Sequence, residues 1–150
     1  MAKLRVVMCD DEPLALDRLG TLLGQREGVE LVAAIQSGQE LLERVERIAP
    51  TLILLDIEMP KVDGFDVVEA LSRMSWPAAA TPPLVIFVTA HPEFAVEAFD
   101  SGAIDFISKP VRLTRLEQAL QRARDAAEQM EARHRLKELS SDAPADQGVL

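Results

Sequence analysis

Apolar and polar positions follow one another along the chain in blocks that predict five strands and five helices. Short continuous apolar runs, each bounded by turn-forming or acidic residues, are typical of strands buried on both faces of a parallel sheet. The predicted strands are Leu4 to Cys9, Val29 to Ile35, Leu52 to Leu55, Leu84 to Thr89 and Ile104 to Ser108.

Apolar residues between these runs recur at helical spacing. Pro13 opens the first predicted helix, Ser37 is a candidate cap for the second, and Gly64 leads into the third. A short fourth helix runs to Gly102, and the fifth follows Lys109 and Pro110. The residues expected to face inward in the first three helices are Leu16, Leu19 and Leu23, then Leu41, Leu42, Val45 and Ile48, and then Phe65, Val68 and Leu71.

Strands that alternate with helices imply right-handed crossovers between parallel strands. The expected fold class is therefore α/β, with a doubly wound, five-stranded parallel sheet. A chain of 150 residues, of which 48% are hydrophobic, suits one globular domain with a sizeable core.

The last predicted helix carries a longer apolar stripe than the sheet needs. Its members follow a heptad spacing and are Leu113, Leu116, Leu120, Ala123, Ala127, Met130 and His134. We therefore expect residues 1–125 to form the globular body and residues 126–150 to form a helical extension and a linker. The segment from Ser140 to Leu150 has the composition of a solvated linker.

Charge is distributed unevenly. Residues 1–108 carry a net charge of −10 and residues 109–150 a net charge of +1. Such an acidic body is repelled by nucleic-acid phosphates, so any contact with DNA would need another module. The single cysteine, Cys9, excludes an internal disulfide and indicates a core position. No stretch approaches membrane-spanning length, and the expected location is the cytoplasm.

The candidate chemistry lies at the carboxyl ends of the strands, where open α/β sheets bind ligands. In this fold Asp10, Asp11, Asp56, Thr89 and Lys109 would converge on one crevice. Clustered carboxylates repel one another unless a cation neutralises them, and such oxygen ligands suit Mg²⁺ rather than Zn²⁺. One carboxylate could then act as a nucleophile. The alternative for Asp56 is a helix cap or a turn residue.

Four motifs carry a resemblance to a known family. They are Asp-Asp-Glu after the first strand, Leu-Asp-x-x-Met-Pro-x-x-Asp-Gly around the third, Thr-Ala after the fourth and Lys-Pro after the fifth. Over residues 4–125 the chain resembles the receiver domain of a two-component response regulator. The resemblance implies a flavodoxin-like sheet with strand order 2-1-3-4-5.

The resemblance also implies roles for the acidic residues. Asp56 would be the phosphoacceptor that takes a phosphoryl group from a sensor histidine kinase. Asp11 and Asp56 would bind Mg²⁺ directly, Asp10 mainly through water, and the backbone carbonyl of Glu58 would supply another ligand. No enzymatic activity is implied beyond Mg²⁺-dependent self-phosphorylation and autodephosphorylation at Asp56.

Thr89 and Lys109 would bind the phosphate, and Phe106 matches the switch aromatic that turns inward when Thr89 moves. An ordinary core role is the alternative for Phe106. The resemblance suggests a cis peptide bond before Pro110. Glu58 and His91 would flank the phosphate's path to water, and a solvated loop position is the alternative for His91.

The run Thr-Ala-His-x-Glu-Phe-Ala-Val-x-Ala-Phe is similar to receivers of LytTR (LytR/AlgR-type) transcriptional regulators. This implies a homodimer on activation and contact with DNA only through a C-terminal LytTR output domain, which residues 1–150 do not include. The expected dimer face comprises the helix from Phe94 to Ser101, the fifth strand and the start of the last helix. Its charged residues are Arg112, Arg115, Arg122 and Arg124 against Glu93, Glu97, Asp100 and Asp105. Departures from the family are a long loop from Ser75 to Pro83 and the pair Lys61-Val62.

Three other interpretations stay open at this point. A stand-alone receiver would act by binding another protein, and a degenerate receiver would never accept phosphate. A haloacid-dehalogenase-type phosphohydrolase also uses an aspartyl nucleophile and Mg²⁺. That family needs a second aspartate two residues after the nucleophile, where this chain has Glu58, and the chain lacks the usual cap insertion.

Overall fold

A computed structural model describes residues 3–77 and 80–142 of the chain. The elements are β1 (Leu4–Cys9), α1 (Pro13–Leu23), β2 (Val29–Ile35), α2 (Gly38–Ile48), β3 (Leu52–Leu55), α3 (Gly64–Arg73), β4 (Leu84–Thr89), a single 3₁₀ turn η1 (Pro92–Phe94), α4 (Ala95–Asp100), β5 (Asp105–Ser108) and α5 (Leu113–Asp142). The strands match the predicted ones, except that the last begins at Asp105 rather than at Ile104.

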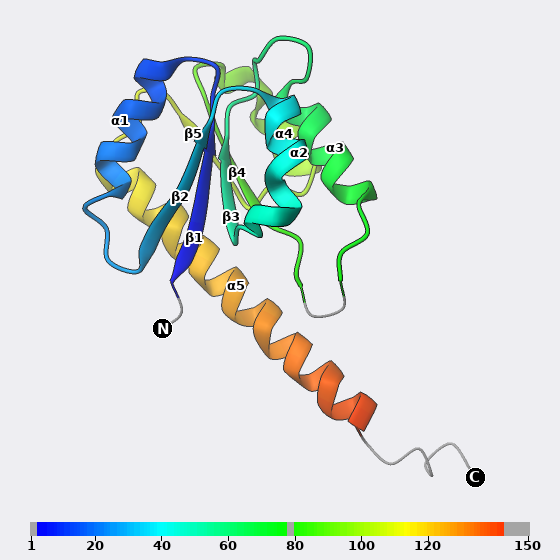
Figure 1. Cartoon of the computed structure of the whole chain (residues 1–150). Coiled ribbons are helices and arrows are strands. Elements are labelled where there is room, and N and C mark those ends of the chain that lie inside the picture. The colour runs from blue at the N-terminus through cyan, green and yellow to red at the C-terminus, as the bar shows by residue number, and fades with distance from the viewer. Residues whose placement is uncertain (1–2, 78–79, 143–150) are drawn as a thin grey trace.

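The five strands form one parallel sheet in the order β2-β1-β3-β4-β5, which confirms the predicted topology. Helices α1 and α5 cover one face of the sheet, and α2, α3 and α4 cover the other (Figure 1). Because all strands run in the same direction, their carboxyl ends meet at a single edge.

The central strand shows why the apolar runs are continuous. All four residues of β3 are buried, and alternate side chains point to opposite faces. Leu52 and Leu54 join the apolar cluster beneath α1 and α5, whereas Ile53 and Leu55 join the cluster beneath α2, α3 and α4. A strand covered on both sides leaves no position for a polar residue until it ends.

Local signals fix where the helices begin. Pro13 occupies the first turn of α1, and the Ser37 hydroxyl accepts a hydrogen bond from the Glu40 amide at 3.0 Å. At α3, the side chains of Asp63 and Asp66 each accept a hydrogen bond from the other's backbone N–H. This reciprocal cap sets the start of the helix that follows the central loop.

The inward face of α3 is wider than predicted, because Val67 joins Phe65, Val68 and Leu71 against the core. Val67 is fully buried there, whereas Phe65 and Val68 are only partly buried, and Leu71 is buried as expected. Rows of residues at three- and four-residue spacing lie side by side on a helix, and the prediction named only one of the two rows that contact the core.

Helix α5 passes the edge of the sheet and extends away from the body (Figure 1). Leu116, Leu120 and Ala123 are buried against the sheet, whereas Leu136 and Leu139 are 65% and 67% exposed. The helix continues through Asp142, so the first three residues of the predicted linker are helical, and residues 143–150 lie outside the described part. Among residues 3–77 and 80–142, no helix combines the length and apolarity that crossing a membrane requires.

We predict that Gly64→Ala destabilises the fold because the central loop packs tightly against this glycine. A Cβ atom at Gly64 would lie 2.5 Å from the backbone oxygen of Asp56 and 2.9 Å from Cα of Ile57. Backbone atoms cannot move aside cheaply, and overpacking of this kind costs about 1–3 kcal/mol. Urea denaturation measures the change in the free energy of unfolding.

The matched control is Gly20→Ala, inside α1. There the nearest atom to an added Cβ is the flexible end of Met8, at 3.4 Å. Alanine is favoured over glycine in a helix by about 1 kcal/mol, so this variant should be as stable as the parent or more so. Equal effects of the two substitutions would contradict the packing argument.

Candidate functional site

Backbone hydrogen bonds extend the sheet by one residue beyond its strands and position the site. The Asp56 amide donates to the Cys9 carbonyl at 2.9 Å, and the Lys109 amide donates to the Thr89 carbonyl at 2.8 Å. Each functional residue is therefore held against the neighbouring strand. The Lys109–Pro110 peptide bond is cis, in agreement with the expectation.

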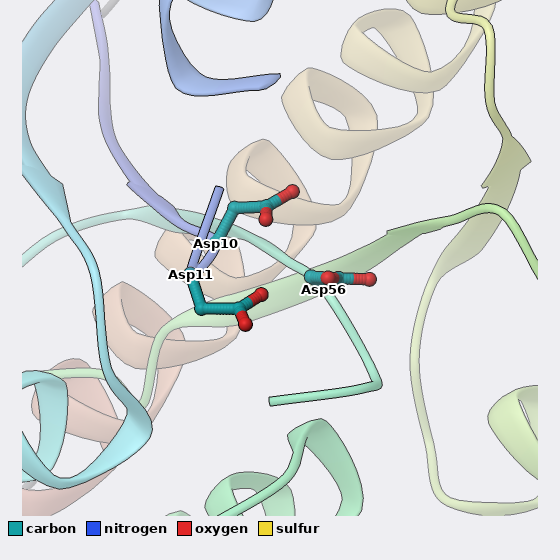
Figure 2. Close-up of side chains that lie close together, drawn as sticks. All are labelled: Asp10, Asp11 and Asp56. Carbon is teal, nitrogen blue, oxygen red and sulfur yellow. The ribbon is translucent and has the colours of Figure 1, made fainter. Parts of the chain in front are cut away.

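Three carboxylates gather at this edge. Asp10 and Asp11 follow β1, Asp56 follows β3, and Figure 2 shows their side chains close together. Each offers an oxygen atom that lies within 4.8 Å of one on the others. Asp10 and Asp56 are only 6% and 5% exposed, so water screens their repulsion weakly.

Lys109 brings the compensating charge. Its Nζ atom lies 2.7 Å from Asp10 Oδ2 and 3.8 Å from Asp56 Oδ2. Burial lowers the pKa of Lys109, but the hydrogen bond with Asp10 and the charge of Asp56 outweigh it, so the net shift is upward. The ammonium group therefore keeps its proton and faces both carboxylates.

The surroundings of Asp56 disfavour its charged form. Burial, and then the charge of Asp10, raise the pKa of Asp56 to about 6 from 3.8, although Lys109 and the Ile57 amide oppose the rise. The Ile57 N–H donates to Asp56 Oδ1 at 2.9 Å. Converging carboxylate oxygens of this kind fit a hard divalent cation, which would relieve the remaining repulsion.

Thr89 and Phe106 complete the predicted set. Thr89 is fully buried at the end of β4, and its hydroxyl accepts a hydrogen bond from the His91 amide at 3.3 Å. Phe106 is 8% exposed and belongs to the apolar cluster beneath α4. The ring thus occupies an inward position in this structure, and its movement with Thr89 stays a prediction.

The rim of the site contains a contact that the sequence did not predict. His91 Nε2 lies 3.0 Å from Glu58 Oε2, and His91 Nδ1 lies 3.4 Å from Glu93 Oε2. This histidine therefore joins the loop after β3 to the turn after β4, rather than standing alone in solvent. Two loops far apart in the sequence carry the pair, so no local pattern could reveal it.

One predicted surface pair proves to be internal. Asp105 is fully buried, and both of its carboxylate oxygens bind Arg115, at 2.6 and 3.0 Å. Arg115 also donates to the Phe106 carbonyl at 2.8 Å. Asp105 and Ile107 point toward α5 while Phe106 points toward α4, so Asp105 cannot serve as a free part of a dimer face, and Arg115, whose side chain is 35% exposed, is already paired with it.

Cys9 is not a candidate nucleophile. It is 1% exposed, and burial together with the charge of Asp10 raises its pKa to about 12. The protonated thiol lies in the core, as the sequence indicated.

We predict that Asp56→Asn stabilises the metal-free protein near neutral pH. The folded protein holds the Asp56 proton more tightly than the unfolded chain does, so stability falls as pH rises from 3.8 to about 6. Above that window an ionised Asp56 costs about 2–3 kcal/mol, which an uncharged amide avoids. Urea denaturation in a chelating buffer at several pH values measures this.

The expected advantage of Asp56→Asn shrinks as pH falls through the window. Asp17→Asn, at an exposed position of α1, is the control and should show no comparable gain. If Asp56→Asn and the parent are equally stable near neutral pH, burial does not strain this carboxylate.

Comparisons with known proteins agree with this geometry. Residues 6–121 match the response regulator receiver domain family. The positive alginate biosynthesis regulatory protein of Pseudomonas aeruginosa is 41% identical over 121 residues, which cover 80% of this chain and 47% of that protein. The sensory transduction protein LytT of Bacillus cereus is 32% identical over 89% of this chain and 53% of its own length. The chain thus spans about half the length of these curated relatives, which are regulators of the LytTR type.

Solved structures show the same fold. The response regulatory domain of protein mrkE from Klebsiella pneumoniae has a TM-score of 0.73 and 32% identity, and covers 83% of this chain and 98% of its own. The response regulator domain of Thermotoga maritima CheB has a TM-score of 0.67 and 26% identity, over 84% and 97% of the two chains. These matches exclude the phosphohydrolase interpretation. The chain belongs to the response regulator receiver domain family of two-component systems.

Proposed function

We propose that Asp56 accepts a phosphoryl group from a sensor histidine kinase and so switches the domain between two states. The observation that carries this proposal is the convergence of three carboxylates with one ammonium group at the sheet edge. Asp10, Asp11 and Asp56 offer oxygens within 4.8 Å of one another, and Lys109 Nζ lies 2.7 Å from Asp10 and 3.8 Å from Asp56.

The proposed chemistry needs positioning and charge neutralisation rather than a dedicated base. A carboxylate oxygen of Asp56 bonds to the phosphorus atom of a phosphohistidine while the phosphorus–nitrogen bond breaks. The electron pair of that bond stays on the imidazole, which then takes a proton from water. An acyl phosphate remains on Asp56, and its hydrolysis returns the free carboxylate; no other turnover is proposed.

Mg²⁺ fits the donor set, because hard cations prefer carboxylate and carbonyl oxygens. Asp11 and Asp56 would hold it directly, Asp10 mainly through water, and the backbone carbonyl of Glu58 would complete the protein ligands. When bound, the ion supplies positive charge that offsets both the clustered carboxylates and the incoming phosphoryl group.

Lys109 and Thr89 would then bind the phosphoryl oxygens. Lys109 is already 3.8 Å from Asp56, so a small movement away from Asp10 would bring its ammonium group to the new dianion. The buried Thr89 hydroxyl would leave the His91 amide for the same target. Phe106 would follow the space that Thr89 vacates, which changes the surface beside α4.

The proposed output is regulation of transcription. Relatives carry names such as positive alginate biosynthesis regulatory protein and transcriptional regulatory protein BtsR. We propose that residues 1–125 act as the receiver and that residues 126–150 lead toward a LytTR-type DNA-binding domain outside this chain. Phosphorylation would act on DNA only through that domain, because the acidic body repels phosphates.

A homodimer on activation is part of the same proposal. After the correction at Asp105, the support is an exposed apolar strip on α4, where Val96 is 74% and Phe99 is 48% exposed. Glu97 of α4 is exposed beside this strip, whereas Arg122 of α5, with a side chain 62% exposed, has its Nη1 atom 3.6 Å from Asp105 Oδ1. Exposed ion pairs contribute only about 0–1 kcal/mol each, so the apolar strip would provide most of the affinity.

We predict that acetyl phosphate adds one phosphoryl group to the protein only when Mg²⁺ is present. Without a divalent cation, the three carboxylates repel the incoming anion. Intact-mass spectrometry measures the addition with and without a chelator. Asp56→Asn should stay unmodified, and phosphorylation of that variant at the parent's rate would refute the assignment of Asp56.

We predict that beryllofluoride, which mimics the phosphoryl group, promotes self-association through α4. Sedimentation velocity should show dimers of the parent and mostly monomers of Val96→Asp. The control is Leu14→Asp on α1, where Leu14 is 68% exposed on the opposite side of the sheet. A monomeric parent at high micromolar concentration with beryllofluoride, at both low and high salt, would exclude the dimer.

A further inference from the structure

An apolar cavity of about 120 Å³ lies behind the carboxylate cluster, between α1 and the sheet. Leu16, Leu19 and Leu22 of α1 line one side of it. Arg18 and Pro110, which also line it, are exposed residues, so the cavity reaches the protein surface. The phosphoacceptor chemistry proposed above does not use this space.

The size of the cavity sets the size of what it can hold. An engineered protein cavity of about 150 Å³ lined by leucine, isoleucine and phenylalanine stays dry and binds benzene. The present cavity is similar in volume, and its lining includes Leu16, Leu19, Leu22 and Leu54. Its apolar part therefore fits one hydrocarbon ring, whose burial releases water from apolar surface on both sides.

One end of the cavity is charged. Asp10, Asp56 and Lys109 all contribute to its lining. Both carboxylates are more than nine-tenths buried, and the single ammonium group lies 2.7 Å from one and 3.8 Å from the other. At this inner end two anions therefore face one cation, whereas the other cation of the lining, Arg18, is an exposed residue whose charge water screens.

We propose that this cavity is a binding site for small primary amines that carry one hydrocarbon ring. The ring would lie among the α1 leucines, and the ammonium group on a short arm would reach Asp56. The site combines an apolar body with a few converging charged groups, as small-molecule sites in proteins commonly do. Benzylamine is the simplest probe of this class.

Occupancy has a consequence for the metal site, on the basis of the function proposed above. Asp10 and Asp56 would serve both the amine and Mg²⁺, so each cation weakens the binding of the other. By thermodynamic linkage, the factor by which Mg²⁺ weakens the amine equals the factor by which the amine weakens Mg²⁺. A neutral ligand with the same ring has no ammonium group, so it should not compete with Mg²⁺.

The test is an NMR titration of the ¹⁵N-labelled protein with benzylamine, benzyl alcohol and benzoate in metal-free buffer. Benzylamine should bind about ten-fold or more tightly than benzyl alcohol, the factor expected for a hydrogen bond to a charged group, and benzoate should bind most weakly. The shifted amides should lie on α1 and at Val111. Added Mg²⁺ should weaken benzylamine but leave benzyl alcohol unchanged.

Ala15→Leu fills the cavity from α1 and should abolish binding of benzylamine and of benzyl alcohol. Thr21→Leu places the same side chain at an exposed position of α1 and should leave binding intact. Val111→Phe fills the cavity from the other side. It replaces Ala15→Leu as the cavity-filling variant if Ala15→Leu does not fold.

Equal affinities for benzylamine and benzyl alcohol, or benzylamine binding that survives a cavity-filling variant, would overturn the proposal. Phosphorylation of Asp56 by acetyl phosphate is measured separately on the same protein without amine. Normal phosphorylation together with absent amine binding refutes the cavity site alone and leaves the proposed function standing.

Discussion

Repulsion among buried carboxylates is the constraint on which the rest of this structure depends. A parallel sheet brings Asp10, Asp11 and Asp56 to one edge, and backbone hydrogen bonds to neighbouring strands hold Asp10 and Asp56 in place. Lys109 offsets part of this charge, yet the pKa of Asp56 stays raised at about 6. The remaining negative charge at this edge therefore favours binding of a cation beside the carboxylate that would receive a phosphoryl group.

Strand β5 connects this charged edge to both helical layers. Phe106 points into the core beneath α4, whereas its neighbour Asp105 is bound to Arg115 of α5. Arg115 also holds the Phe106 carbonyl, so the backbone of the switch residue is anchored while its ring faces the other way. On the α4 side, toward which the Phe106 ring points, Val96 and Phe99 are exposed.

The sequence by itself determined the fold class, the strand order and most of the site. Continuous apolar runs in strands such as Leu52 to Leu55 require cover on both faces, and alternation with helices then predicts a doubly wound parallel sheet. The strand order came from the resemblance of the motifs to those of receiver domains. Because every parallel strand ends at the same edge, Asp56, Thr89 and Lys109 could be brought together from sequence position alone. The fold class and this convergence of side chains are consequences of local periodicity and chain direction.

Only the tertiary structure decided which polar groups pair and which faces are buried. The His91–Glu58 contact, the internal Asp105–Arg115 pair and the burial of Val67 each depend on packing between elements. So does the cavity behind Asp56, whose lining comes from α1, the sheet and the loop after β5. Short-range patterns specify the periodicity of an element but not its rotation against a neighbour by one residue, and that rotation selects the contacts.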